Sequence, residues 1–412
     1  MRRILIIVGT LVLLIALGLS AYFLFFSKGS GIAVGPDPFG SADDRDPGAV
    51  TPVDTGVPTP GAGTVFPPRL MKLTNGPVAK GTASIYFPPQ LSAPVTASST
   101  ATTTQTTVIA VPEDVEVRYI DRQSGNVYSF RIHERTMTRL SNKTLPGIED
   151  ASWTRDGSRA FVRFLEKDGT EERVSTYLLP VSGEGGYFLT QGLAQITAAS
   201  SSVLTLLSSG SGSVATIMNT DGSGATTIFS SVMSSLRVAF AGSGYVAQTK
   251  ASAHLDGYAF LVDKAGTFTR VLGPLRGLST LPSPSGTKIL YSYADRGKIY
   301  TQVFDTATRT AVPLPLSTLP EKCVWTPGSD ALYCGVPTSL SGILPDDWYQ
   351  GARSFSDRVW RIDLATRVAT LTFDPRQLAD VQIDAQSLSI DAGEDVLVFM
   401  NKVDGSLWSY DL

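Results

Sequence analysis

The side chains that most often carry chemistry are scarce in this sequence. Its 412 residues include two histidines, His133 and His254, and two cysteines, Cys323 and Cys334. Neither a His-Glu-x-x-His zinc motif nor a Gly-x-Ser-x-Gly nucleophile turn occurs in it. A catalytic triad or a histidine-rich metal centre is therefore not expected. We predict no metal site and no cofactor, with both histidines on the surface or packed against strands.

The two cysteines have a spacing that suits a cross-strand bond. A turn at residues 327–330 (PGSD) would place Cys323 opposite Cys334 in an antiparallel hairpin. Directly opposed residues lie about 4.5 to 5.5 Å apart at Cα, which a disulfide can bridge. We predict a structural disulfide, and two buried free thiols are the alternative.

A third candidate combines aromatic rings with carboxylates. Residues 344–350 (LPDDWYQ) contain Asp346, Asp347, Trp348 and Tyr349. Exposed aromatic side chains beside charges are common at recognition surfaces, so we predict a binding site at these four residues. The alternative is an ordered loop in which Trp348 only covers the adjacent sheet.

Composition indicates the kind of element that must position these residues. Charged residues make up 17% of the chain, and there are 38 glycines and 25 prolines. Such a composition favours short strands joined by many turns. The formal charge is −3 without a run of Lys or Arg, so nucleic-acid binding is not expected.

Turns between apolar strands recur at an even interval. Equivalent points give steps of 43, 43, 43 and 42 residues, and they are Gly157, Ser200, Ser243, Gly286 and Gly328. Two further turns, at Gly81 and Gly393, bring the number of repeats to seven. Inserts near residues 88–112 and 335–355 account for the longer gaps beside them.

Each repeat has room for four strands. Alternating apolar residues form a second hairpin after the turn, as in residues 117–130 (VRYIDRQSGNVYSF) and 259–268 (AFLVDKAGTF). A four-stranded sheet every 43 residues is the unit of a β-propeller. We therefore predict an all-β, seven-bladed β-propeller over residues 69–412.

The two ends of this region are expected to complete one blade together. The last residues, 405–412 (GSLWSYDL), match the third strand of a blade. Residues 69–73 (RLMKL) have the pattern of the missing outer strand. Pairing of the two would close the ring and remove open sheet edges.

One repeat carries a motif that resembles a known family. The segment 153–159 (WTRDGSR) is similar to the Trp-Ser-Pro-Asp-Gly-Lys signature of TolB-like, WD-like repeats, which also occur in dipeptidyl-peptidase-type propeller domains. The resemblance implies the fold and little about function, and the third and fourth repeats lack both the Trp and the Asp-Gly pair. We expect no counterpart of the peptidases' hydrolase domain, so peptidase activity is not carried over.

The N-terminal end has the features of a membrane anchor. Residues 4–26 contain no charge and would span ~35 Å as a helix, against a hydrocarbon core of about 30 Å. Arg2 and Arg3 precede this span, so the positive-inside rule places the N-terminus in the cytoplasm. A cleaved signal peptide is the alternative. We predict a cytoplasmic stub and single transmembrane helix over residues 1–28, and a disordered Pro/Gly-rich linker over 29–68.

These features favour a binding protein over an enzyme. We predict a cell-membrane protein with an extracytoplasmic propeller that is anchored in the lipid bilayer through residues 4–26. It would serve as a non-catalytic platform for a protein or cell-wall partner. The alternative is a propeller enzyme that acts on polysaccharide with carboxylates as a glycosidase or lyase. A ligand sensor would need a second subunit for its output.

Overall fold

The computed structural model describes residues 68–91, 110–168 and 171–412. The predicted transmembrane segment and nearly all of the predicted linker lie outside the described residues. Within the described part, no helix is long and apolar enough to cross a membrane.

Apart from one short two-stranded sheet, the described strands form seven sheets of four strands each, which are the blades. The predicted all-β, seven-bladed architecture is confirmed. From the centre outward, blades 1 to 3 consist of β2 (Ala83–Phe87), β5 (Asp114–Ile120), β6 (Val127–Arg131) and β7 (Thr136–Arg139); β8 (Ile148–Trp153), β9 (Arg159–Asp168), β10 (Glu171–Pro180) and β11 (Tyr187–Phe188); and β12 (Leu193–Ala198), β13 (Ser202–Ser209), β14 (Gly212–Asn219) and β15 (Thr226–Ser231).

Blades 4 to 6 repeat this order without a crossover. They consist of β16 (Leu236–Ala241), β17 (Gly244–Thr249), β18 (Asp256–Val262) and β19 (Phe268–Arg276); β20 (Ser279–Pro282), β21 (Lys288–Asp295), β22 (Lys298–Asp305) and β23 (Thr310–Pro313); and β24 (Cys323–Trp325), β25 (Ala331–Pro337), β26 (Asp357–Asp363) and β27 (Ala369–Phe373).

Blade 7 closes the ring with a strand from the other end of the chain. It consists of β28 (Ala385–Ile390), β29 (Val396–Asn401), β30 (Leu407–Asp411) and β1 (Leu70–Lys72). Leu70 pairs with Tyr410 and Lys72 with Trp408. The predicted outer strand within residues 69–73 is therefore confirmed, and the edge of β30 is covered.

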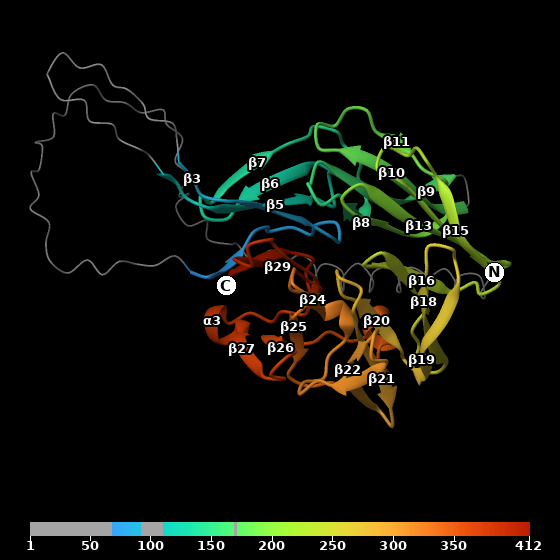
Figure 1. The fold of residues 1–412 in the computed structure, drawn as a ribbon. Coiled ribbons are helices and arrows are strands. Elements are labelled where there is room, and N and C mark those ends of the chain that lie inside the picture. The colour runs from blue at the N-terminus through green and yellow to red at the C-terminus, as the bar shows by residue number, and fades with distance from the viewer. Residues whose placement is uncertain (1–67, 92–109, 169–170) are drawn as a thin grey trace, which may run out of the picture. The chain divides into compact units, whose positions relative to one another are not determined.

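The first strands of successive blades lie side by side around the centre of the ring. Figure 1 shows the blades following one another from β5 to β7 in cyan, through β19 in yellow, to β27 and β29 in red. The Gln195 side chain illustrates the contact, because it accepts a hydrogen bond from Val238 N at 3.0 Å and donates to Val238 O at 2.7 Å. The indole of Trp325 likewise donates to Leu281 O of the preceding blade at 3.1 Å.

The repeated turns fall where the sequence predicts them, with one exception. Gly157, Ser200, Ser243, Gly286, Gly328 and Gly393 all lie between the first and second strands of their blades. Gly81 does not, because it precedes the first strand β2 of blade 1. A Cβ at Gly81 would lie 2.2 Å from Ala151 O of blade 2, so this glycine permits close approach of two blades and does not form a hairpin.

Two long connections interrupt the regular pattern. Residues 88–113 join the first two strands of blade 1 and include the paired strands β3 (Gln90–Leu91) and β4 (Ala110–Val111). Residues 338–356 join β25 to β26 and contain the short helix α2 (Asp346–Tyr349). Two other short helices precede first strands, namely η1 (Pro320–Lys322) before β24 and α3 (Pro375–Ala379) before β28.

Candidate functional site

One end of the ring carries the connection with the predicted binding residues. This end, which we call the capped face, is formed by the connections that enter the first strands and by those between second and third strands. Residues 338–356, which we call the cap, are a connection of the second kind. The cap contacts blade 4 because Asp346 Oδ2 accepts a hydrogen bond from Ala253 N at 2.6 Å.

The four predicted binding residues hold the cap in place, within itself and against the rest of the ring. Asp347 Oδ2 accepts a hydrogen bond from Ile343 N at 2.8 Å, which fixes the loop that leads into α2. Trp348 is buried, and its Nε1 donates to both Oδ1 and Oδ2 of Asp384 at 3.0 Å. Binding through these residues stays a prediction.

Tyr349 completes this set at the inner side of the cap. Its hydroxyl donates to Glu321 Oε1, which also accepts a hydrogen bond from Ser279 Oγ at 2.6 Å. Burial and the neighbouring Glu321 carboxylate raise the pKa of Tyr349 well above its ordinary value. The phenol is thus held as a neutral hydrogen-bond donor that joins the cap to blades 5 and 6.

Beneath the cap lies a group of three charged side chains that are completely buried. Lys322, Asp357 and Asp384 each have no exposed side-chain surface. Lys322 Nζ lies 2.7 Å from Asp357 Oδ2 and 3.1 Å from Ala385 O, and it also contacts Asp384 Oδ1. We call these three residues the buried charge cluster.

The two carboxylates of the cluster differ in their partners. Asp384 accepts hydrogen bonds from the Trp348 indole and from Phe355 N at 3.0 Å. Asp357 Oδ2 accepts one from Ala385 N at 2.7 Å, whereas its Oδ1 has no hydrogen-bond partner. Burial raises the pKa of Asp357 to about 6, although Lys322 opposes this increase.

Sequence reasoning missed the buried charge cluster. Its three members come from three connections of the capped face, each at or next to the start of a strand. The one local signal is the apolar setting of Asp384 between Ile383 and Ala385. A lone charge in such a setting is unusual, but it does not identify its partners.

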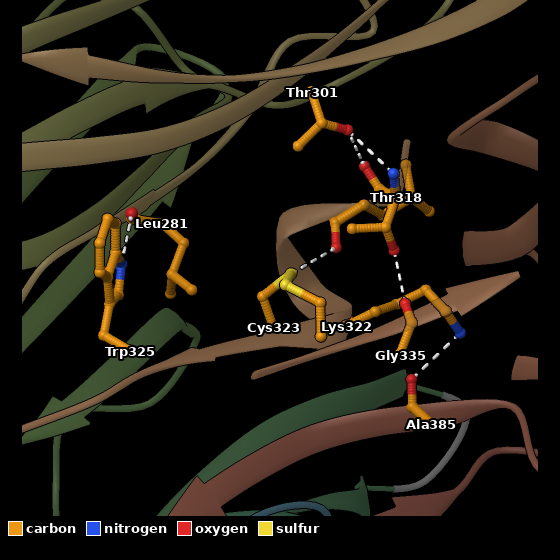
Figure 2. The surroundings of a disulfide bond; sticks show 10 residues. Leu281, Thr301, Thr318, Lys322, Cys323, Trp325, Gly335 and Ala385 are labelled. Carbon is orange, nitrogen blue, oxygen red and sulfur yellow. Dashed lines mark hydrogen bonds between the residues drawn. A yellow bond between two sulfur atoms is a disulfide. The ribbon is translucent and has the colours of Figure 1, made fainter. Parts of the chain in front are cut away.

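The predicted disulfide lies directly beside this cluster. Cys323 and Cys334 are paired across β24 and β25, with a Cα–Cα distance of 4.1 Å and an S–S bond of 2.10 Å. Figure 2 shows the bond next to Lys322 and close to the hydrogen bond from Thr318 Oγ1 to Gly335 O. The disulfide thus fixes the first strand of blade 6 where Lys322 enters the centre of the ring.

A solvent-accessible hollow opens beside the cap. It has a volume of about 290 Å³ and lies between the cap and the connections of blades 4 and 5. Ile343, with 49% of its surface exposed, forms part of its wall. Three basic side chains also line it, namely His254, Arg276 and Arg296.

The other histidine, His133, lies between blade 1 and the last strand, β30. His133 Nδ1 lies 3.6 Å from Asp114 Oδ1, and its Nε2 lies 3.8 Å from Asp411 Oδ1. His254 is exposed in the wall of the hollow. Within residues 68–91, 110–168 and 171–412, no group of three or more His, Cys, Asp or Glu side chains is placed to hold a metal ion.

Comparison with known proteins identifies the architecture. No family model matches the sequence, and no curated protein is similar to it in sequence. An oligogalacturonate lyase in complex with manganese is similar in structure, with a TM-score of 0.51, 11% identity, and coverage of 81% of this chain and 98% of the lyase. The fold is that of a β-propeller.

Two further solved propellers are more distant. TolB from Acinetobacter baumannii has a TM-score of 0.41 and 13% identity, with 60% of this chain and 59% of TolB covered. The propeller domain of the Trilobed protease from Pyrococcus furiosus has a TM-score of 0.48 and 8% identity, with 72% of this chain and 90% of that domain covered. At such low identities no activity is carried over from these proteins to this chain.

Proposed function

We propose that this chain is a membrane-anchored, extracytoplasmic β-propeller that acts as a non-catalytic binding platform for a protein or cell-envelope component. Binding would occur at the capped face, in the hollow beside the cap. The hollow is the observation that carries the proposal, because it combines an exposed apolar side chain, Ile343, with the basic groups of Arg276 and Arg296. Such a surface suits a partner that presents an apolar group next to an anionic one.

The environment of the nearby carboxylates supports binding over glycosidase chemistry at this face. Asp357 and Asp384 lie close together but have no exposed side-chain surface, and Lys322 lies between them. A glycosidase needs two carboxyl groups that reach a sugar from opposite sides. These two carboxyl groups are closed to any polysaccharide.

The experiment that tests binding uses a photo-crosslinking amino acid at Ile343 in the full chain, expressed in its own cells. We expect a defined adduct with one partner. The control is the same substitution at Ala365, an exposed residue in the turn at the opposite end of blade 6. Equal adducts from both positions, or turnover of a polysaccharide by the purified protein, would contradict the proposal.

The proposed anchor is supported by the 23 uncharged positions of residues 4–26 and the two arginines before them. The disulfide adds support, because such bonds form outside the reducing cytosol. A reporter enzyme that is active only after export, fused at Leu412, should be active. If a reporter that works only in the cytosol is active at Leu412 and the export-dependent reporter is not, the assigned orientation is wrong.

A further inference from the structure

The buried charge cluster holds an amine and two carboxyl groups in contact without solvent. Lys322 Nζ is also enclosed by aromatic rings, with the Trp348 centroid at 5.1 Å and the Phe355 centroid at 5.5 Å. Burial at this depth favours the neutral form of a carboxyl group, and it raises the pKa of Asp357. Transfer of a proton from the ammonium to a carboxylate would leave a neutral amine beside a neutral carboxylic acid.

We propose that Lys322 and Asp384 form an intramolecular isopeptide bond, with Asp357 as the acid–base group, so that blades 6 and 7 are covalently joined at the centre of the ring. Enclosure of reacting groups in contact raises their effective concentration to roughly 10⁵ to 10⁸ M. Condensation that is unfavourable between free amines and acids in water is favoured by such enclosure, because the released water leaves for bulk solvent.

The hydrogen bonds of Asp384 suit it to be the acyl group. The Trp348 indole and the Phe355 amide both donate to its carboxyl oxygens. Donors in this position polarise the carbonyl and stabilise the negative oxygen that develops when an amine attacks Cγ. Asp384 therefore has the equivalent of an oxyanion site.

Asp357 is placed to move the protons. Its Oδ2 lies 2.7 Å from Lys322 Nζ, and its Oδ1 has no hydrogen-bond partner. The raised pKa of Asp357 suits a group that must both accept and donate a proton near neutral pH. No other group is needed for this role.

The reaction is a condensation without any change in oxidation state. The neutral Nζ attacks Cγ of the protonated Asp384, and Asp357 accepts a proton from the nitrogen. Asp357 then passes this proton to the departing hydroxyl, which leaves as water. One C–N bond forms, one C–O bond breaks, and Asp357 returns to its starting state.

Mass spectrometry of the full chain, purified in detergent and reduced to open the disulfide, tests this inference. Lys322→Arg is the matched reference because arginine keeps the positive charge but cannot form the bond. After correction for the substitution, the wild-type chain should be lighter than this variant by about 18 Da, the mass of one water. Tryptic digestion should yield a branched peptide that contains residues 322 and 384, with no cleavage after Lys322.

Two variants test the assigned roles. Asp384→Asn should still form the bond but release ammonia, so the loss should fall to about 17 Da. Asp357→Ala should leave most chains unlinked, while its disulfide still forms and reports the local fold. Equal corrected masses of the wild type and Lys322→Arg would overturn the proposal, and a branched peptide that joins Lys322 to Asp357 would overturn the roles.

Discussion

Trp348 donates its Nε1 hydrogen to both carboxyl oxygens of Asp384, and each N···O distance is 3.0 Å. The indole belongs to the cap between the second and third strands of blade 6, whereas Asp384 precedes the first strand of blade 7. This contact therefore joins two blades and covers the buried charge cluster. Trp348, which the sequence suggests as a recognition residue, is therefore buried in the interior.

Replacement of Trp348 should destabilise the ring. Trp348→Ala removes a buried ring and should cost about 3 to 5 kcal/mol in the free energy of unfolding. Trp348→Phe keeps most of the ring but leaves Asp384 without this donor, at a cost of about 1 to 3 kcal/mol. Urea unfolding measures both values. Ile343→Ala is the control in the same cap, and its effect should stay within about 0.5 kcal/mol because Ile343 is exposed.

The disulfide should contribute to stability by restricting the unfolded chain. Cys323 and Cys334 are separated by 11 residues, and closure of such a loop contributes about 3 kcal/mol. The double variant Cys323→Ala with Cys334→Ala should therefore unfold at a lower temperature. Calorimetry with and without reductant should show a shift for the wild type and none for the variant. If full reduction of the disulfide leaves the unfolding temperature of the wild type unchanged, this expectation is wrong.

Closure of the ring should depend on the buried residue of the N-terminal strand β1. Leu70 is 8% exposed and packs in one core cluster with Tyr410 and Phe373. Leu70→Asp would bury an unpaired charge and should cost about 3 to 5 kcal/mol. Lys72→Ala, at the exposed end of the same strand, should cost no more than about 1 kcal/mol. Urea unfolding compares the two, and similar losses would argue against this closure.

The contact between blade 1 and the end of β30 should respond to pH through His133. Desolvation, the largest single effect, lowers the pKa of His133, but the Glu113 carbonyl and the carboxylates of Asp114, Asp411 and Glu113 together raise it above its ordinary value. The folded state therefore binds the proton more tightly than the unfolded state does. The resulting stabilisation is complete below the unfolded pKa of about 6.5 and is lost as the pH rises through the folded pKa.

His133→Gln should consequently reduce stability more at about pH 5.5 than at about pH 8.5, by less than about 1 kcal/mol because the site is partly exposed. Urea unfolding at the two pH values measures the difference. Asp411→Asn keeps the histidine but removes one carboxylate, so its pH dependence should lie between those of wild type and His133→Gln. A larger effect of His133→Gln at the higher pH would show that the sign is wrong.

The single misplaced turn shows where pattern alone is insufficient. Gly81 has the flanking residues of a hairpin turn, yet it lies before β2, beside Ala151 of blade 2. A glycine that relieves a contact between blades and a glycine that forms a turn look alike in one sequence. The distinction depends on the neighbouring blade, which the local pattern does not contain.

The sequence by itself determined the seven blades, the closing strand and the pairing of Cys323 with Cys334. Each of these follows from alternation along a strand and from the register that a short turn imposes, which are properties of nearby residues. Only the tertiary structure decided that Trp348 faces inward and that Lys322, Asp357 and Asp384 meet. These side chains come from separate connections, and contacts between connections depend on how whole blades pack, so no repeat or spacing in the chain encodes them.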